Sequence, residues 1–235
     1  FLPGESIVKK SNPRRRHNLG YLVAIIVTVS LVAILLLPQS GWLIRPGPMN
    51  TGHESLECES CHRNAKGSLR QQLQANVQYF LNKRESLADI GYRPVDNRDC
   101  LACHLRKNDN HPVFRFYEPR FKKARESVQP HLCMSCHQEH KGVRVTREAD
   151  FCSNCHENLE IKKDPLQVSH KQLVEQKKWK SCIGCHDYHG NHVMKIVTDS
   201  TDAHSDKVIT EYFKGGDSPY SKQKRYKAKE TRYDE

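Results

Sequence analysis

The longest apolar stretch of the chain lies near its N-terminus. No charged residue occurs from Leu19 to Ile44, and the centre of this stretch reads YLVAIIVTVSLVAILLL. At about 1.5 Å per residue, a helix of this length measures roughly 39 Å, which is enough to cross a bilayer. The pattern predicts one transmembrane helix over residues 19–44.

The flanks of this segment predict its orientation. Tyr21 and Trp42 lie near its two ends, as aromatic residues at a membrane interface do. Only Arg45 follows closely, whereas five cations precede the segment: Lys9, Lys10, Arg14, Arg15 and Arg16. We therefore expect a cytoplasmic basic tail over residues 1–18 and everything after residue 45 outside. A cleaved signal peptide is the alternative, but the apolar run is long for one and no small-x-small cleavage site follows it.

The remaining chain is polar and shows two helical patterns. Apolar residues recur with helical spacing at Leu69, Leu73, Val77, Leu81, Leu87 and Ile90. Ser68 is the expected N-cap and Gly91 the expected stop. A shorter helix is expected after Pro119, in PRFKKARES, and no segment alternates like a strand. The predicted fold class is mostly α with extensive loops and few or no strands.

Composition divides the part after the apolar segment into three regions. Residues 45–57 form a linker that contains Gly and Pro, and residues 58–199 are punctuated by cysteines. Residues 200–235 are polar and basic and end in KQKRYKAKETRYDE. A tail of this composition is expected to be disordered alone and to become ordered by docking on a partner subunit.

All ten cysteines belong to five copies of one motif, CxxCH. The copies are Cys58, Cys61 and His62; Cys100, Cys103 and His104; Cys133, Cys136 and His137; Cys152, Cys155 and His156; and Cys182, Cys185 and His186. Histidine makes up 14 of 235 residues, so five such coincidences arise by chance in about one case in a million.

This motif is typical of covalent attachment of haem c. Two thiols separated by two residues can both bond one haem edge, and the next histidine then reaches the iron as proximal ligand. Zinc ribbons, thioredoxin-like sites and disulfides do not require a histidine after every pair. Five covalent haems would also fill the interior of a domain with few apolar side chains. The predicted cofactors are five haems c, mostly with two histidine ligands.

The formal net charge of +11 is compatible with a protein that carries five haems. Each haem carries two propionates, so five haems offset about ten positive charges. We therefore expect no nucleic-acid partner.

Nine histidines lie outside the motifs, and His17 falls on the predicted cytoplasmic side. Five of the other eight are the expected sixth ligands of the irons: His53, His111, His140, His170 and His192. His140 is expected to reach a neighbouring haem rather than that of its own motif. Some choices stay open: His189 in place of His192, and a ligand role for His131, His204 or Met49.

The CxxCH motifs in close succession, with CxxCHxxH at His140 and His189, resemble class III multihaem c cytochromes over residues 50–195. Together with the N-terminal segment, the chain also resembles the pentahaem subunit of alternative complex III and the NapC/NirT quinol dehydrogenases. In the latter group the first motif often reads CxxCHxM, whereas here Arg63, Asn64 and Ala65 follow His62 and no Met is near.

These resemblances imply an electron-transfer subunit that is not an enzyme by itself. The expected location is the bacterial inner membrane, with one span and a periplasmic haem domain. A quinol or a partner redox centre would be the donor and a cytochrome the acceptor. The alternatives are a stand-alone quinol dehydrogenase, a multihaem reductase, and a structural or sensory anchor. No CxxCK motif, which some multihaem enzymes carry, is present.

The motifs begin 42, 33, 19 and 30 residues apart. Such short intervals favour a continuous row of haems, and the 19-residue interval predicts that the third and fourth lie closest.

Overall fold

The computed structural model describes residues 13–36 and 46–229 of the chain. The chain divides into two compact units, residues 1–46 and residues 47–235. The predicted positions of Lys9, Lys10, Trp42 and Arg45, and the end of the tail after residue 229, lie outside the described residues.

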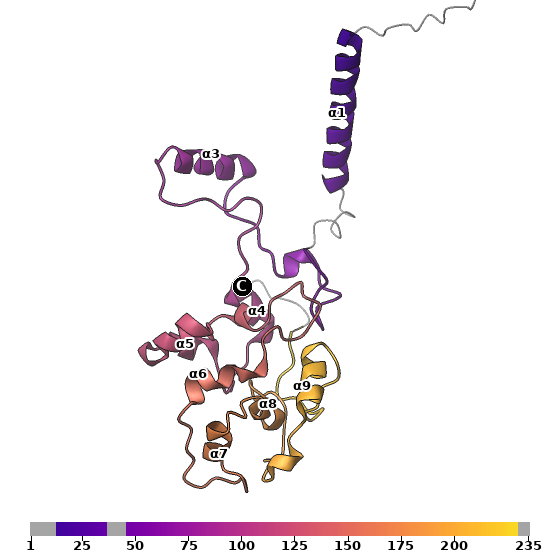
Figure 1. The fold of residues 1–235 in the computed structure, drawn as a ribbon. Coiled ribbons are helices and arrows are strands. Elements are labelled where there is room, and N and C mark those ends of the chain that lie inside the picture. The colour runs from indigo at the N-terminus through magenta and orange to yellow at the C-terminus, as the bar shows by residue number, and fades with distance from the viewer. Residues whose placement is uncertain (1–12, 37–45, 230–235) are drawn as a thin grey trace, which may run out of the picture. The chain divides into compact units, whose positions relative to one another are not determined.

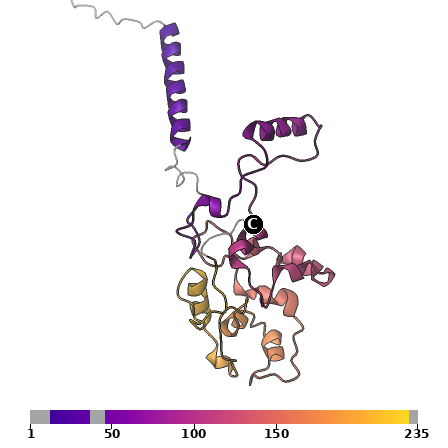
Figure 2. The same cartoon turned by 180° about the vertical axis from the view of Figure 1, so that it is seen from behind.

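The described residues form short helices joined by loops, as predicted (Figures 1 and 2). The α-helices are α1 (Pro13–Leu36), α3 (Leu69–Phe80), α4 (Asn97–His104), α5 (Lys122–Ser127), α6 (Ser153–His156), α7 (His170–Glu175), α8 (Ser181–Cys185) and α9 (Asp206–Phe213). The 3-10 turns are Cys58–Ser60, Val113–Tyr117, Pro119–Phe121, Cys133–Ser135, Ala149–Cys152 and Ser200–Asp202. Within this part of the chain no strand forms, and only two isolated bridges pair backbone segments.

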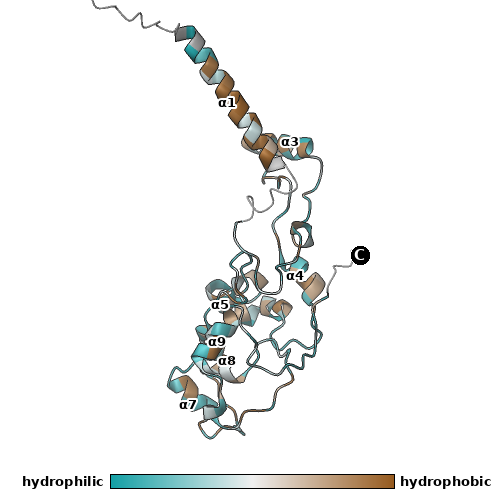
Figure 3. Cartoon of the chain, turned by 90° about the vertical axis from the view of Figure 1, so that its right-hand side faces the viewer, coloured by the Kyte–Doolittle hydropathy of each residue, from teal (hydrophilic) through white to brown (hydrophobic). Residues whose placement is uncertain are grey.

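Helix α1 is the N-terminal apolar helix. It has 24 residues, and its stretch Arg16–Ile34 has a mean hydropathy of 2.0 (Figure 3). By length and composition it could cross a membrane, although a signal sequence has the same properties. It begins at Pro13, six residues before the predicted start, and residues 37–44 of the predicted span lie outside the described residues.

Helix α3 begins where the sequence predicts and ends earlier. The side chain of Ser68 accepts the Gln71 N–H, and the Gln71 side chain accepts the Ser68 N–H, which forms a capping box. The expected continuation to Gly91 is wrong, because Asn82 adopts a φ of 55° directly after the last turn. The N–H of Lys83 then donates to the carbonyl of Gln78, and the N–H of Asn82 donates to the carbonyl of Tyr79. These two bonds form a Schellman motif that ends the helix.

The chain folds back along α3 after this turn. Asn76 exchanges two hydrogen bonds with the backbone of Ala88, at 2.6 and 3.0 Å, and Gln72 accepts the Gly91 N–H. The apolar stripe of the helix remains exposed at Leu69, Leu73, Val77, Phe80 and Leu81. Polar side chains, rather than the apolar stripe, therefore hold this hairpin together.

The helix expected after Pro119 is confirmed. A 3-10 turn over Pro119–Phe121 leads directly into α5. Ala124 of this helix is buried, and the nearby Phe116 and Val128 are buried as well.

The C-terminal tail packs on its own chain. Helix α9 lies beside α8 (Figure 1), and Ile209 joins Ala149, Ile183 and Tyr220 in the main apolar cluster. The Tyr220 hydroxyl donates to the Ile183 carbonyl at 2.6 Å. Contacts within the chain thus account for the order of this tail over residues 200–229, so that order gives no support for a docked partner.

The apolar core of the second unit is small. Among the described residues, seven hydrophobic side chains are buried: Phe116, Ala124, Val128, Ala149, Ile183, Ile209 and Tyr220. The hydropathy of this unit is correspondingly mixed along the whole of its length (Figure 3). Polar contacts therefore make an unusually large contribution to holding the loops.

One such contact fixes α4. The side chain of Asp99 is fully buried, and Arg93 donates to its two oxygens at 2.7 and 3.0 Å. The same carboxylate accepts the N–H of Asp96 at the start of the helix. Asp99 therefore joins the start of the helix to Arg93 in the loop before it.

Asp99→Ala is expected to destabilise the folded protein by roughly 2 to 4 kcal/mol, because it leaves a partly buried Arg93 without its main partner. The midpoint of urea unfolding, followed by circular dichroism, measures the change. Arg98→Ala removes an exposed pair with Asp96 and should not move the midpoint. Equal shifts in the two variants would contradict the role given to Asp99.

Candidate functional site

Each CxxCH motif forms a single helical turn. In the first, third and fifth motifs the N–H of the histidine bonds the carbonyl of the first cysteine, at 2.8 to 3.0 Å. The second motif lies at the end of α4 and the fourth runs from a 3-10 turn into α6. Residues i, i+3 and i+4 share a helix face, so each turn presents both thiols and the imidazole on one side. All ten cysteines are free thiols in the structure.

The motif histidines each face one histidine from elsewhere in the chain. We number these pairs as sites 1 to 5, in the order of their motifs. The distances between ring centres are 6.3 Å for His62–His140, 5.8 Å for His104–His53, 6.2 Å for His137–His189, 6.3 Å for His156–His111 and 6.1 Å for His186–His170. Each of the five motif histidines thus has a different partner histidine, and the five distances between ring centres are nearly equal.

This distance matches two imidazoles that share one metal ion. Two metal–nitrogen bonds of about 2 Å each, plus the distance from each nitrogen to its ring centre, place the ring centres roughly 6 Å apart. In the described part of the chain no group of three or more His, Cys, Asp or Glu side chains is arranged to hold a bare metal ion. A pair of histidines is the ligand set of a haem iron, whose other four ligands come from the porphyrin.

Hydrogen bonds to Nδ1 fix the orientation of most of the partner rings. The Nδ1 atoms of three of them donate to carboxylates: His53 to Glu139 at 2.9 Å, His170 to Asp164 at 2.9 Å and His189 to Asp109 at 3.0 Å. The Nδ1 of His111 donates to the Tyr188 carbonyl at 2.7 Å. The Nδ1 of His137, a motif histidine, donates to the Arg144 carbonyl at 2.8 Å. These bonds leave Nε2 with its lone pair, which is the usual arrangement for a metal-binding histidine.

Burial also prepares the rings for metal binding. It lowers the pKa of His104 to about 4, and burial likewise lowers the pKa values of His111, His137 and His186. These four rings are therefore neutral at pH 7, the form that coordinates a metal. Together with the ring spacing, this shows that the residues present fit a haem iron, which the histidine pairs would hold.

Four of the five expected sixth ligands face a motif histidine. They are His53, His111, His140 and His170. The ring of His140 lies opposite His62 of the first motif rather than His137 of its own. The Nδ1 of His140 is buried and has no hydrogen-bond partner, unlike the Nδ1 atoms of the four other partner rings, those of His53, His111, His170 and His189.

The fifth expected ligand, His192, lies elsewhere. Its Nδ1 donates to Asp187 at 2.8 Å, and its Nε2 accepts from the Ser218 hydroxyl at 3.4 Å. Its buried ring packs on Tyr220, with ring centres 5.3 Å apart. Both ring nitrogens are thus used within the fold, and His189 takes the place opposite His137.

Sequence spacing contains a signal for His189. It follows His186 by three residues, just as His140 follows His137, so CHDYH repeats CHQEH. This repeat favours His189 over His192 as the partner of a motif histidine.

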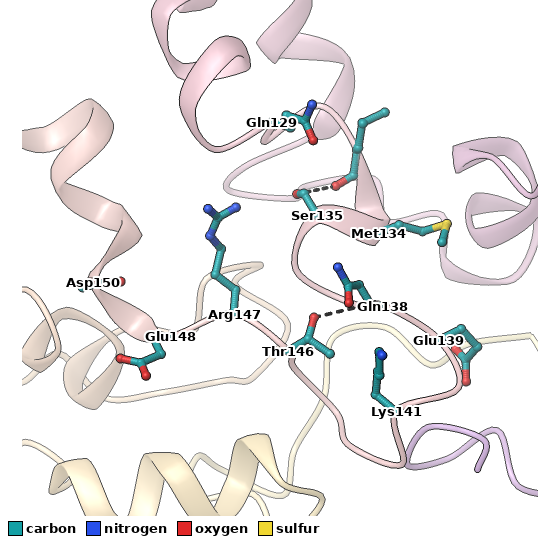
Figure 4. Close-up of a pocket in the computed structure, with 11 residues that line it drawn as sticks. Gln129, Met134, Ser135, Gln138, Glu139, Lys141, Thr146, Arg147, Glu148 and Asp150 are labelled. Carbon is teal, nitrogen blue, oxygen red and sulfur yellow. Dashed lines mark hydrogen bonds between the residues drawn. The ribbon is translucent and has the colours of Figure 1, made fainter. Parts of the chain in front are cut away.

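The other candidates lie away from the pairs. The ring of His204 packs on Tyr220 at 5.8 Å, and that of His131 on Tyr117 at 5.3 Å. Two further methionines, Met134 and Met194, could also be considered as ligands by residue type. Met194 packs against the main apolar cluster. Met134 lines an open pocket with Glu139, Lys141, Arg147 and other polar residues, and no histidine belongs to this lining (Figure 4).

Neighbouring motifs contact each other through their first cysteines. A hydrogen bond between the thiols of Cys100 and Cys133 raises the pKa of the former and lowers that of the latter. In the same way, a bond with Cys152 lowers the pKa of Cys182 to about 7. These contacts join site 2 to site 3 and site 4 to site 5.

Sites 3 and 4 are joined differently. The ring of Tyr188 stacks on His111 at 4.2 Å and meets His189 edge-on at 5.0 Å. A different contact links the second and third motifs. The Asn97 side chain at the start of α4 donates to the His131 carbonyl and accepts the Cys133 N–H.

Comparison with family models, with curated proteins and with solved structures gave no match to this chain.

Proposed function

We propose that this chain is a membrane-anchored electron-transfer protein that binds five haems c. The observation that carries the proposal is the set of five histidine pairs, each of which joins a CxxCH histidine to a different second histidine near 6 Å. The spacing of the motifs in sequence and the spacing of the ring pairs in space thus point to the same cofactor.

The cysteines would bind the cofactors covalently and the histidine pairs would hold the irons. When bound, haem c supplies a one-electron couple, and iron with two histidine ligands has no open position for a substrate. This favours electron transfer over substrate conversion. Tyr188, which contacts both His111 and His189, and the contacts between first cysteines link sites 2 to 5. Glu139, the neighbour of His140 of site 1, bonds His53 of site 2, which extends the row to site 1.

Helix α1 would be the membrane anchor, with the second unit on the periplasmic face of a bacterial inner membrane. The support for this is its length, its hydropathy and the cations at its start. A partner subunit or a quinol would be the donor, and a cytochrome the acceptor. The NapC/NirT-like alternative, a stand-alone quinol dehydrogenase, is favoured by the same anchor.

A spectroscopic redox titration of the detergent-solubilised full chain tests this function. We expect five electrons to be taken up per chain, an exclusively low-spin spectrum, and rapid oxidation of the reduced protein by an oxidised small cytochrome. Nitrite and hydroxylamine should not reoxidise it at a comparable rate. A substantial high-spin signal with turnover of either substrate would favour a reductase instead, and oxidation of a quinol analogue by the pure chain would favour the dehydrogenase.

A further inference from the structure

Two loops that carry partner histidines of different sites interlock. Asp109 lies two residues before His111 of site 4, yet its Oδ2 accepts the Nδ1 proton of His189 of site 3 at 3.0 Å. In return, Tyr188, the neighbour of His189, offers its carbonyl to Nδ1 of His111 at 2.7 Å. Each loop therefore orients the ring that the other loop supplies.

The backbones of these loops are joined as well. Asp109 Oδ1 accepts the His111 N–H at 2.9 Å, and the Asn110 N–H donates to the His189 carbonyl at 3.3 Å. Gly190 has a φ of 66°, and a side chain there would collide with Asn110. The two loops are thus in close contact, and one carboxylate binds both histidine residues.

Sites 1 and 2 show the same arrangement. Glu139 is adjacent to His140 of site 1, but its Oε2 accepts from Nδ1 of His53 of site 2 at 2.9 Å. Its Oε1 accepts the Asn50 N–H at 2.7 Å. The buried Asn50 side chain in turn bonds the Gln138 carbonyl and the Lys141 N–H, on both sides of His140.

Site 5 differs from these two pairs. Asp164 accepts both the backbone N–H of His170 at 2.6 Å and its Nδ1 proton at 2.9 Å, and the two residues are only six positions apart. This carboxylate contacts a single partner histidine. It offers a natural comparison, because it is the same chemical group bound to the same ring atom.

We infer that Glu139 and Asp109 are positioning residues that each set the ligation of two irons, so that sites 1 and 2, and sites 3 and 4, form as linked pairs, whereas site 5 forms alone. This inference rests on the proposed function. Its physical basis is that removal of either carboxylate releases a ring of one site and loosens the loop that carries the ring of another.

Carbon monoxide binding to the reduced full chain tests this linkage, since it occurs only at an iron that has lost a protein ligand. The haem content of each variant is measured first, by the pyridine haemochrome assay. With five haems retained, wild type should bind almost no carbon monoxide and Asp164→Ala up to about one equivalent. Asp109→Ala and Glu139→Ala should each bind about two equivalents of carbon monoxide per chain. Asp109→Asn, whose one carbonyl oxygen can still accept one of the two N–H groups, should bind less than Asp109→Ala.

Equal binding of about one equivalent by all three alanine variants would overturn the linkage and leave the haem sites intact. No binding by Asp109→Ala and Glu139→Ala would overturn it too. Fewer than five haems in the wild-type protein would instead contradict the proposed function. If an alanine variant loses haems, Asp109→Asn is the deciding variant. Carbon monoxide binding by Asp109→Asn that is no higher than that of the wild type would contradict a positioning role for Asp109.

Discussion

His189→Gln is expected to create about one equivalent of haem per chain that binds carbon monoxide, whereas His192→Gln should create none. The His189 ring lies 6.2 Å from that of His137, and its Nδ1 donates to Asp109, so its Nε2 would be free to bind the iron of a haem at site 3. Glutamine is too weak a ligand to replace it. His192 already uses both ring nitrogens, with Asp187 and Ser218.

The two variants form a matched pair, because both residues lie in one loop and receive the same substitution. Low-temperature electron paramagnetic resonance of the oxidised proteins should show a high-spin signal in the first variant alone. His192→Gln is expected to lower thermal stability, since the His192 ring is buried against Tyr220. The reverse result, with the high-spin haem in His192→Gln only, would show that His192 is the ligand and that the pairing at site 3 is wrong.

The chain produced without haem attachment is expected not to fold over residues 47–229. Only seven apolar side chains are buried among the described residues. Ordering the backbone costs about 1 to 2 kcal/mol per residue, and so small a core cannot offset that cost. Five covalent haems would supply the missing apolar contact area.

This second prediction is tested on the full chain in detergent, made in cells with and without the cytochrome c maturation apparatus. Near-ultraviolet circular dichroism and limited proteolysis should show fixed structure only for the haem-containing form. Helix α1 serves as the internal control, because an apolar segment in detergent should stay helical in both preparations. A haem-free chain that resists proteolysis as well as the haem-containing form would contradict the view that haems form most of the interior.

Much of this architecture could be predicted from local patterns. The apolar run predicted α1, the Ser68 cap and the leucine spacing predicted the start of α3, and Pro119 predicted the helical segment that contains α5. The motif turns follow directly from the CxxCH spacing. These features depend on residues close in sequence, where capping and periodicity decide the structure.

Long-range choices were harder to predict. The end of α3 depends on the left-handed conformation of Asn82, which competes with an apolar pattern that continues to Ile90. The choice between His189 and His192 depends on Asp109, which lies 80 residues away from His189 in sequence. The packing of the tail depends on the apolar cluster that Ile209 and Tyr220 form with Ala149 and Ile183, which lie far away in sequence. Sequence periodicity carries no information on such contacts.

The intact mass of the denatured full chain tests the central claim most directly. Protein purified from cells that attach haem c should exceed the mass of the polypeptide by five haem groups, because thioether bonds survive denaturation. A mass equal to that of the polypeptide alone, or of the polypeptide with its ten cysteines joined in disulfides, would contradict the account.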